Sequence, residues 1–163
     1  MNLFRRIFPY LALIAILLVA HWSATRGHFR GPMPPLQGLS LDGRSITLQP
    51  PGEPTLIYFW ATWCGVCRAV HGSVADIAKD YPVVAIAIQS GPPAQVTRSV
   101  KKHPFGGRTT VLVDPDGVLA QLLGVRGVPT FFFVNRKGEI VSSTAGYTTE
   151  VGLRLRLFLA DKG

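Results

Sequence analysis

The sequence is short of the residues from which several kinds of site are built. Its 163 residues include only two cysteines, two methionines and four histidines. Two cysteines exclude a four-cysteine zinc site and a small domain that depends on several disulfides. Acidic residues are also few, with 9 Asp and Glu against 17 Lys and Arg, which gives a formal net charge of +8. Because the basic residues are scattered and form no stripe with aromatic residues between them, we expect no nucleic-acid binding.

Charge is absent from one long stretch near the N-terminus. Residues 7–25, between Arg6 and Arg26, contain no Asp, Glu, Lys or Arg and are rich in Leu, Ile and Ala. A helix of this length spans about 28 Å, close to the ~30 Å hydrocarbon core of a bilayer. Arg5 and Arg6 favour an N-terminus that stays in the cytoplasm. We therefore predict a cytoplasmic segment over 1–6 and a single-pass transmembrane anchor over 7–25.

Two alternatives to an anchor remain for this apolar stretch. A cleaved secretory signal would need small residues at the cleavage site. Ala20 and Ala24 are candidate cleavage positions, but the preceding Leu18 and Trp22 are large. A buried core helix is the other alternative. The following residues 26–35, rich in Gly, Pro and Arg, are predicted to be a tether, and residues 36–163 a single domain.

The domain sequence alternates between strand and helix patterns, which is typical of an α/β fold. A tight turn at Asp42–Gly43 predicts a hairpin at its start, and a strand, a helix and a strand in that order predict a parallel pair. The closing helix is capped by Thr149 and has one apolar stripe of Val151, Leu155, Phe158 and Leu159. The expected strands cover 39–41, 46–48, 55–60, 83–88, 110–113, 130–134 and 140–143, and the expected helices cover 63–79, 94–102, a short stretch ending near 123, and 150–160.

Both cysteines occur together as Cys64-Gly65-Val66-Cys67, after a predicted buried strand and at the first turn of a predicted helix. The N-terminus of a helix carries partial positive charge and free N–H groups, which favour a thiolate at Cys64. In this interpretation Cys64 attacks a partner and forms a mixed disulfide, and Cys67 then attacks Cys64 and releases the partner. Both cysteines are therefore the predicted catalytic residues.

Three other roles for the cysteine pair stay open. A structural disulfide is one, although so small a loop restrains the unfolded chain little. A zinc site is another, but it needs two more ligands, and His71 is the one histidine near the pair in sequence. A membrane-tethered copper(I)-binding protein could use the two thiolates alone. No metal site is predicted.

The sequence around the cysteines resembles the thioredoxin superfamily. Residues 59–68, FWATWCGVCR, are similar to its active-site stretch, and residues 127–130, GVPT, to its second signature. The resemblance covers about residues 36–160 and implies a thioredoxin-like central mixed sheet flanked by helices, after an N-terminal β-hairpin and one transmembrane helix. It implies a cis peptide bond before Pro129 and substrate binding at Val128 and Pro129. The residues Trp63, Gly65 and Val66 would support the active site.

The hairpin, the helix near 94–102 and the apolar N-terminus resemble the membrane-tethered, TlpA-like branch of that superfamily. Residues 144–156 are most similar to the suppressor-of-copper-sensitivity protein D type of disulfide oxidoreductase. The resemblance implies a domain in the periplasm of a bacterium, anchored in the inner membrane. It also implies protein thiols or disulfides as clients, an inner-membrane electron donor or acceptor, no cofactor besides the cysteine pair, and a monomer. The oxidising periplasm and the tether favour reduction over oxidation of clients.

The sequence departs from its relatives at two positions next to the cysteines. Thioredoxins have a buried Asp where this chain has Tyr58, and cytochrome-maturation reductases have a Glu where it has Val70. Either carboxylate would accept the proton of the resolving thiol. Their replacement argues against efficient cytochrome c reduction. His71 is a substitute proton acceptor, or else a partly exposed histidine on the helix.

Overall fold

The structure is a computed structural model, and it describes residues 2–25, 27–49 and 52–162. A single eight-stranded sheet in the order β1-β8-β7-β4-β5-β6-β2-β3 forms its centre. The strands are β1 (Gly31–Pro32), β2 (Leu36–Leu39), β3 (Ser45–Leu48), β4 (Thr55–Trp60), β5 (Val83–Ile88), β6 (Thr109–Asp114), β7 (Thr130–Val134) and β8 (Glu139–Ala145). The helices are α1 (Asn2–Thr25), α2 (Gly65–Ile77), α3 (Pro93–Lys102), α4 (Val118–Leu122) and α5 (Glu150–Lys162).

The sheet is mixed, as the sequence predicts. β4 pairs parallel with β5 and β5 with β6, so the crossover through α2 joins neighbouring parallel strands. β7 runs antiparallel to both β4 and β8. The predicted hairpin is also present, because β2 and β3 pair with Leu39 opposite Ser45, but its first strand covers Leu36–Leu39 and not the predicted 39–41. This hairpin extends the sheet beyond β6 at the edge opposite β1.

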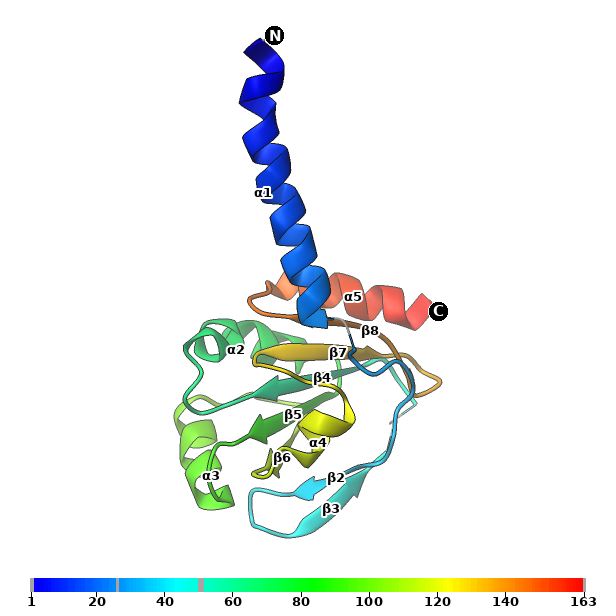
Figure 1. Ribbon diagram of the computed structural model, residues 1–163. Helices are drawn as coiled ribbons and strands as arrows, with labels where there is room; N and C mark the ends of the chain where they lie inside the picture. Colours follow the sequence, from blue (N-terminus) through cyan, green and yellow to red (C-terminus); the bar gives the residue numbers. More distant parts are fainter. Residues whose placement is uncertain (1, 26, 50–51, 163) are drawn as a thin grey trace.

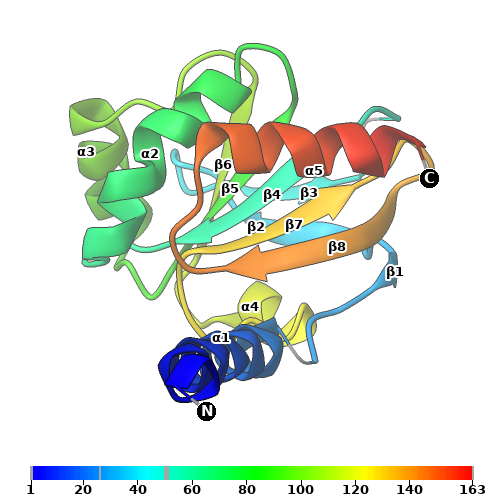
Figure 2. The same cartoon turned by 90° about the horizontal axis from the view of Figure 1, so that it is seen from above.

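Helices cover both faces of the sheet. This explains why β4 has apolar side chains on both of its faces. Alternate side chains of a strand point to opposite faces. Leu56, Tyr58 and Trp60 therefore pack with residues of α2 and α5, while Ile57 and Phe59 pack with residues of α4. Figure 2 shows α2, α3 and α5 on one side of the sheet and α4 with α1 on the other.

The apolar stripe of α5 does not face the sheet. The buried residues of this helix are Leu153, Leu157 and Ala160, whereas the four residues of the stripe are all exposed. Burial of these three residues in the core sets the rotation of the helix, and on its flank the Arg154 guanidinium donates hydrogen bonds to Asp80 and to the Asp76 carbonyl at the end of α2. The predicted cap is confirmed by the Gly152 N–H, which donates to the Thr149 hydroxyl at 3.2 Å.

The segment predicted to be a tether packs on the domain from residue 27 onward. Gly31 and Pro32 form β1 against the β8 edge. His28 and Met33 are buried, and the Phe29 N–H donates to the Leu123 carbonyl. These side chains cover the α4 face of the sheet. Burial of their apolar surface stabilises the packed position of the segment.

The N-terminal apolar stretch forms most of α1, which projects away from the domain (Figure 1). Pro9 lies inside this helix. A membrane span is predicted over 7–25; in the described ranges, none of the helices combines the length and the apolar character that a span requires.

Candidate active site

Cys64 and Cys67 form a disulfide at the N-terminus of α2. Cys64 is the N-cap residue of this helix, with an extended backbone, and its Sγ accepts a hydrogen bond from the Cys67 N–H at 3.0 Å. Only 6% of Cys64 and 1% of Cys67 is exposed, so Cys64 is the sulfur that a partner reaches first. The neighbouring Gly65 and Val66 are exposed and border the pair on the solvent side.

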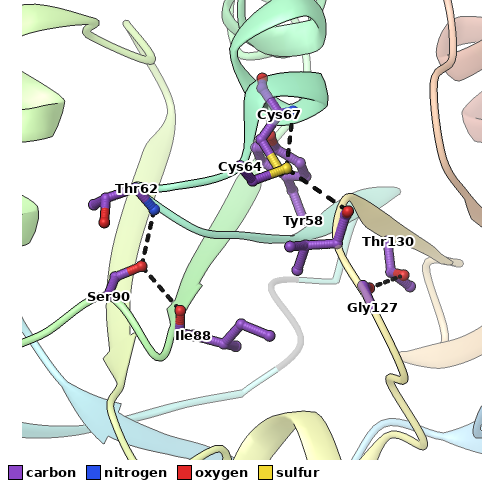
Figure 3. Close-up of a disulfide and its surroundings, with 9 residues drawn as sticks. Tyr58, Thr62, Cys64, Cys67, Ile88, Ser90, Gly127 and Thr130 are labelled. Atoms are coloured by element: carbon purple, nitrogen blue, oxygen red, sulfur yellow. Dashed lines mark hydrogen bonds between the residues drawn. A yellow bond between two sulfur atoms is a disulfide. The ribbon is translucent and has the colours of Figure 1, made fainter.

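The loop before β7 lies against Cys64. The Val128–Pro129 peptide bond is cis, as the resemblance implies, and the Val128 carbonyl oxygen lies 3.7 Å from the Cys64 Sγ. Figure 3 shows this loop beside the sulfur, on the side of the pair away from Thr62. The Thr130 hydroxyl donates to the Gly127 carbonyl at 2.7 Å, which closes the loop on itself. The structure therefore brings the predicted substrate-binding residues to the predicted attacking cysteine.

The residues just before Cys64 are held by the turn after β5. The Thr62 N–H donates to the Ser90 hydroxyl, which donates to the Ile88 carbonyl, each at 2.9 Å (Figure 3). Trp63 is 61% exposed, yet its indole N–H donates to the Gln89 carbonyl at 3.0 Å. Gln89 has a φ of +45°, which is uncommon for a residue other than glycine. Nothing in the sequence distinguishes Ser90 or Gln89, because their role depends on the position of β5 beside β4.

Tyr58 and Val70, the two residues that stand where relatives have carboxylates, are both fully buried. The Tyr58 hydroxyl donates to the Cys67 carbonyl at 3.3 Å, and its ring stacks on Phe131 at a centroid distance of 4.9 Å. Burial raises the pKa of Tyr58 above its usual range, so the phenol stays neutral and acts as a donor. Val70 packs in the core beneath α2. Neither position offers a base to Cys67.

His71 lies one helical turn after Cys67 and is half-buried. Its ring stacks on Phe105 at a centroid distance of 4.0 Å, and its Nε2 lies 2.6 Å from the His103 carbonyl oxygen. Since a carbonyl only accepts, Nε2 carries the proton in the neutral ring and Nδ1 has the free lone pair. Burial, with a smaller contribution from the charge of His103, lowers the pKa of His71. That it takes the proton of Cys67 stays a prediction.

Two hollows adjoin the cysteine pair. The first, which we call the basic cleft, has a volume of about 180 Å³ and lies between α2 and α3; it is lined by Trp60, Ala61, Thr62, Cys67, Arg68, His71, Ser99, Lys102 and His103. The second, which we call the loop groove, has a volume of about 320 Å³; it is lined by Trp63, Ile88, Gln89, Asp116, Gly117, Ala120, Gln121, Val125, Arg126, Gly127 and Val128. A client bound at Cys64 can contact both hollows.

A metal would find few ligands here. In the described ranges, no group of three or more His, Cys, Asp or Glu residues is placed to hold a metal ion. The two cysteines are joined to each other, and His71 uses its Nε2 for the His103 carbonyl. The chemistry that the arrangement supports is an exchange of disulfides at Cys64.

The chain is similar in sequence and in fold to known proteins. The Redoxin family model matches residues 28–152. The chain belongs to the Redoxin family. A thioredoxin-like protein of Haemophilus influenzae is 36% identical over 124 residues, which are 74% of this chain and 72% of that protein. The thiol:disulfide interchange protein DsbE of Pseudomonas fluorescens biotype C is 33% identical over 102 residues, 61% of this chain.

Solved structures agree with this assignment to the Redoxin family. The lipoprotein thioredoxin Etrx1 of Streptococcus pneumoniae superposes with a TM-score of 0.67 at 26% identity, over 77% of this chain and 99% of that one. A thio-disulfide isomerase of Thermus thermophilus superposes with a TM-score of 0.65 at 27% identity, over 81% and 96% of the two chains. The protein is thus a thioredoxin-like oxidoreductase. The chain spans only about half the length of the Pseudomonas DsbE protein, because the matched residues cover 56% of that protein.

Proposed function

We propose that this protein exchanges disulfides with protein thiols through Cys64 and Cys67. The observation that carries the proposal is the position of the Cys64 Sγ. This sulfur accepts a hydrogen bond from the Cys67 N–H at 3.0 Å, at the start of α2. It also lies 3.7 Å from the Val128 carbonyl oxygen. In the reduced protein the same N–H and the helix N-terminus stabilise negative charge on Cys64. The Cys64 thiolate formed in this way is the nucleophile.

The exchange is proposed to run in the direction of client reduction. The Cys64 thiolate attacks one sulfur of a client disulfide, the S–S bond of the client breaks, and its other sulfur leaves as a thiolate that takes up a proton. The Cys67 thiol then loses its proton and attacks the Cys64 sulfur. This forms the Cys64–Cys67 disulfide and releases the second client sulfur as a thiolate. The cysteine pair has lost two electrons and the client has gained them.

Substrate is proposed to bind along the loop at Val128 and Pro129. An extended client segment can add to the exposed backbone of such a loop as a short strand, which presents its sulfur to Cys64. Trp63, with 61% of its surface exposed, supplies apolar contact area beside the sulfur. Neither contact requires a particular client sequence, so the site suits a range of protein disulfides.

We also propose a location in the periplasm, held at the inner membrane by the N-terminal stretch. The charge-free residues 7–25 and the preceding Arg5 and Arg6 support it. A tethered monomer would stay close to an inner-membrane protein that returns electrons to the cysteine pair. The similarity of residues 144–156 supports a narrower assignment to the suppressor-of-copper-sensitivity protein D type. Carbonate extraction of membranes would test the anchor, since a peripheral protein is released and an inserted one is not.

The decisive experiment is to trap clients on a Cys67→Ala variant of the full chain. This variant can form the mixed disulfide at Cys64 but cannot resolve it, so adducts that dithiothreitol removes should accumulate. The matched control is Cys64→Ala, which should trap none. No trapped protein, together with an alkylation rate of Cys64 typical of an ordinary thiol, would contradict the proposal. Tight one-to-one copper(I) binding without exchange activity would favour a copper carrier.

The direction of exchange is tested by the reduction potential of the pair. Equilibration with glutathione, followed by separation of the two redox forms, measures it. A potential well below the range of about −180 to −210 mV supports a reductase. A potential near about −120 mV would make the protein an oxidant of its clients.

A further inference from the structure

The charged residues that line the basic cleft are all positive. Arg68 extends from α2 and Lys102 from the last turn of α3, and both are exposed. His71 and His103 complete the ionisable groups of the lining, and no Asp or Glu is part of it. The loop groove differs, because it has one charge of each sign, Asp116 and Arg126. We therefore expect any preference of the site for negatively charged partners to come from the basic cleft.

No carboxylate of the described residues neutralises the positive charge of the cleft. Neither Arg68 nor Lys102 forms an ion pair with a carboxylate of the described residues. The ion pairs among the described residues lie elsewhere. They join Arg44 with Asp42, Lys79 with Asp76, Arg108 with Glu53, Arg136 with Asp161, and Arg154 with Asp80 and Glu150. The two side chains at the cleft are consequently available to a group from outside.

The position of Arg68 is not explained by the stability of its helix. The N-terminus of a helix favours negative side chains, and a cation there is unfavourable. Arg68 nevertheless follows Cys67 near the start of α2, whose first turn contains no acidic residue. Lys102 is different, since the C-terminal turn of α3 favours a cation. A positive charge at Arg68 therefore suggests a role for the cleft in binding.

We propose that the basic cleft binds a carboxylate of the redox partner while the partner's sulfur reacts with Cys64. The proposal rests on the disulfide exchange proposed above and specifies its partners. The positive charges of Arg68 and Lys102 attract the carboxylate. The Ser99 hydroxyl adds a hydrogen-bond donor in the same lining. Cys67 also lines the cleft, so a carboxylate bound there lies next to the cysteine pair.

The expected contribution is a faster encounter and a modest gain in affinity. Exposed ion pairs are individually weak, but a cleft with charge of one sign steers a partner of the opposite sign. The effect should weaken as salt is added, because the Debye length falls from about 10 Å at 0.1 M to about 3 Å at 1 M. Acidic partners should thus react faster than neutral ones at low ionic strength.

The test compares two disulfide-linked peptides that differ only at the residues flanking cysteine, Glu in one and Gln in the other. The reduced full-length protein should reduce the Glu peptide about fivefold faster at low salt, and the difference should shrink at 1 M salt. Lys102→Glu should abolish or reverse this preference. Lys101→Glu is the matched control, because it changes the net charge equally on the same helix but lies outside the cleft lining. It should keep the preference.

Two small disulfides distinguish the source of the carboxylate. Oxidised glutathione carries carboxylates, and bis(2-hydroxyethyl) disulfide is uncharged. A Lys102-dependent preference for glutathione assigns the cleft to small acidic thiols, while a preference confined to peptides assigns it to acidic polypeptides. Both results support the proposal.

Equal rates for the Glu and Gln peptides, or equal losses in Lys102→Glu and Lys101→Glu, would overturn the carboxylate site and leave the disulfide exchange intact. If the wild-type protein reduces neither peptide, the proposed function fails as well.

Discussion

The Tyr58 hydroxyl donates a hydrogen bond to the Cys67 carbonyl at 3.3 Å, in the fully buried layer between β4 and α2. This bond joins the central strand to the turn of helix that carries the resolving cysteine. Where thioredoxins have a carboxylate that can accept a proton, this chain has a neutral phenol that positions the backbone. The proton of Cys67 must therefore leave by another route, and His71 is the nearest candidate along α2.

Tyr58→Phe is expected to lower stability and leave the exchange chemistry in place. The variant removes one buried hydrogen bond but keeps the ring that stacks on Phe131, so the free energy of unfolding should fall by about 1 kcal/mol. Denaturant titration of the oxidised protein measures the loss, and reduction of a model disulfide measures the activity. A tenfold loss of activity at unchanged stability would instead show that the phenol takes part in proton transfer.

Stability should fall as pH drops below about 6.5, the unfolded pKa of histidine. His28 is buried, its Nδ1 lies 2.9 Å from the Ser143 hydroxyl, and its Nε2 has no hydrogen-bond partner among the described residues. Burial first, and then the charges of Arg126 and Arg30, lower the pKa of His28 in the folded protein. The unfolded chain consequently binds a proton that the folded chain does not, and acid favours unfolding.

His28→Gln is the variant that tests this pH dependence. Its loss of stability between pH 7.5 and pH 5 should be smaller than that of the wild type, measured by denaturant titration at each pH. Some dependence should remain, because burial also lowers the pKa of His71. An unchanged pH dependence in His28→Gln would contradict the assignment.

Two leucines of α5 give a direct test of which face of that helix is buried. Leu157→Ala should cost about 2–5 kcal/mol, because the side chain is fully buried against the sheet. Leu155→Ala removes the same atoms from a side chain that is 56% exposed and should change stability by less than about 1 kcal/mol. Thermal unfolding of both variants measures the difference. A larger loss in Leu155→Ala would mean that this face is covered in solution.

The strands from β4 to β8 and the cysteine pair could be predicted from the sequence because each depends on local pattern. Continuous apolar runs predict β4 and β5, and the cysteines at a strand-to-helix boundary predict the redox site. The face of α5 could not be predicted, because both Leu155 and Leu157 belong to possible apolar stripes, and the choice depends on packing against residues of β4 and α2 that are distant in sequence. Long-range contacts of this kind leave no local signal.

The supports of the site were missed for the same reason. Ser90 lies 28 residues from Thr62, whose N–H it accepts, and their proximity arises only once β5 pairs with β4. The packing of residues 27–35 was also missed. Gly and Pro are typical of linkers, and the sequence does not reveal that β8 has a free edge for Gly31 and Pro32.

That pairing of β1 with β8 has a mechanical consequence. Any pull transmitted through α1 reaches the domain first at the buried His28 and at Phe29, whose N–H donates to the Leu123 carbonyl, and then at this strand pair on the outer edge of the sheet. β8 and β7 lie between this edge and β4, the strand that leads to Cys64. A load on the N-terminal helix would therefore also act on Leu123, the C-cap residue of α4, which precedes the loop that carries Val128.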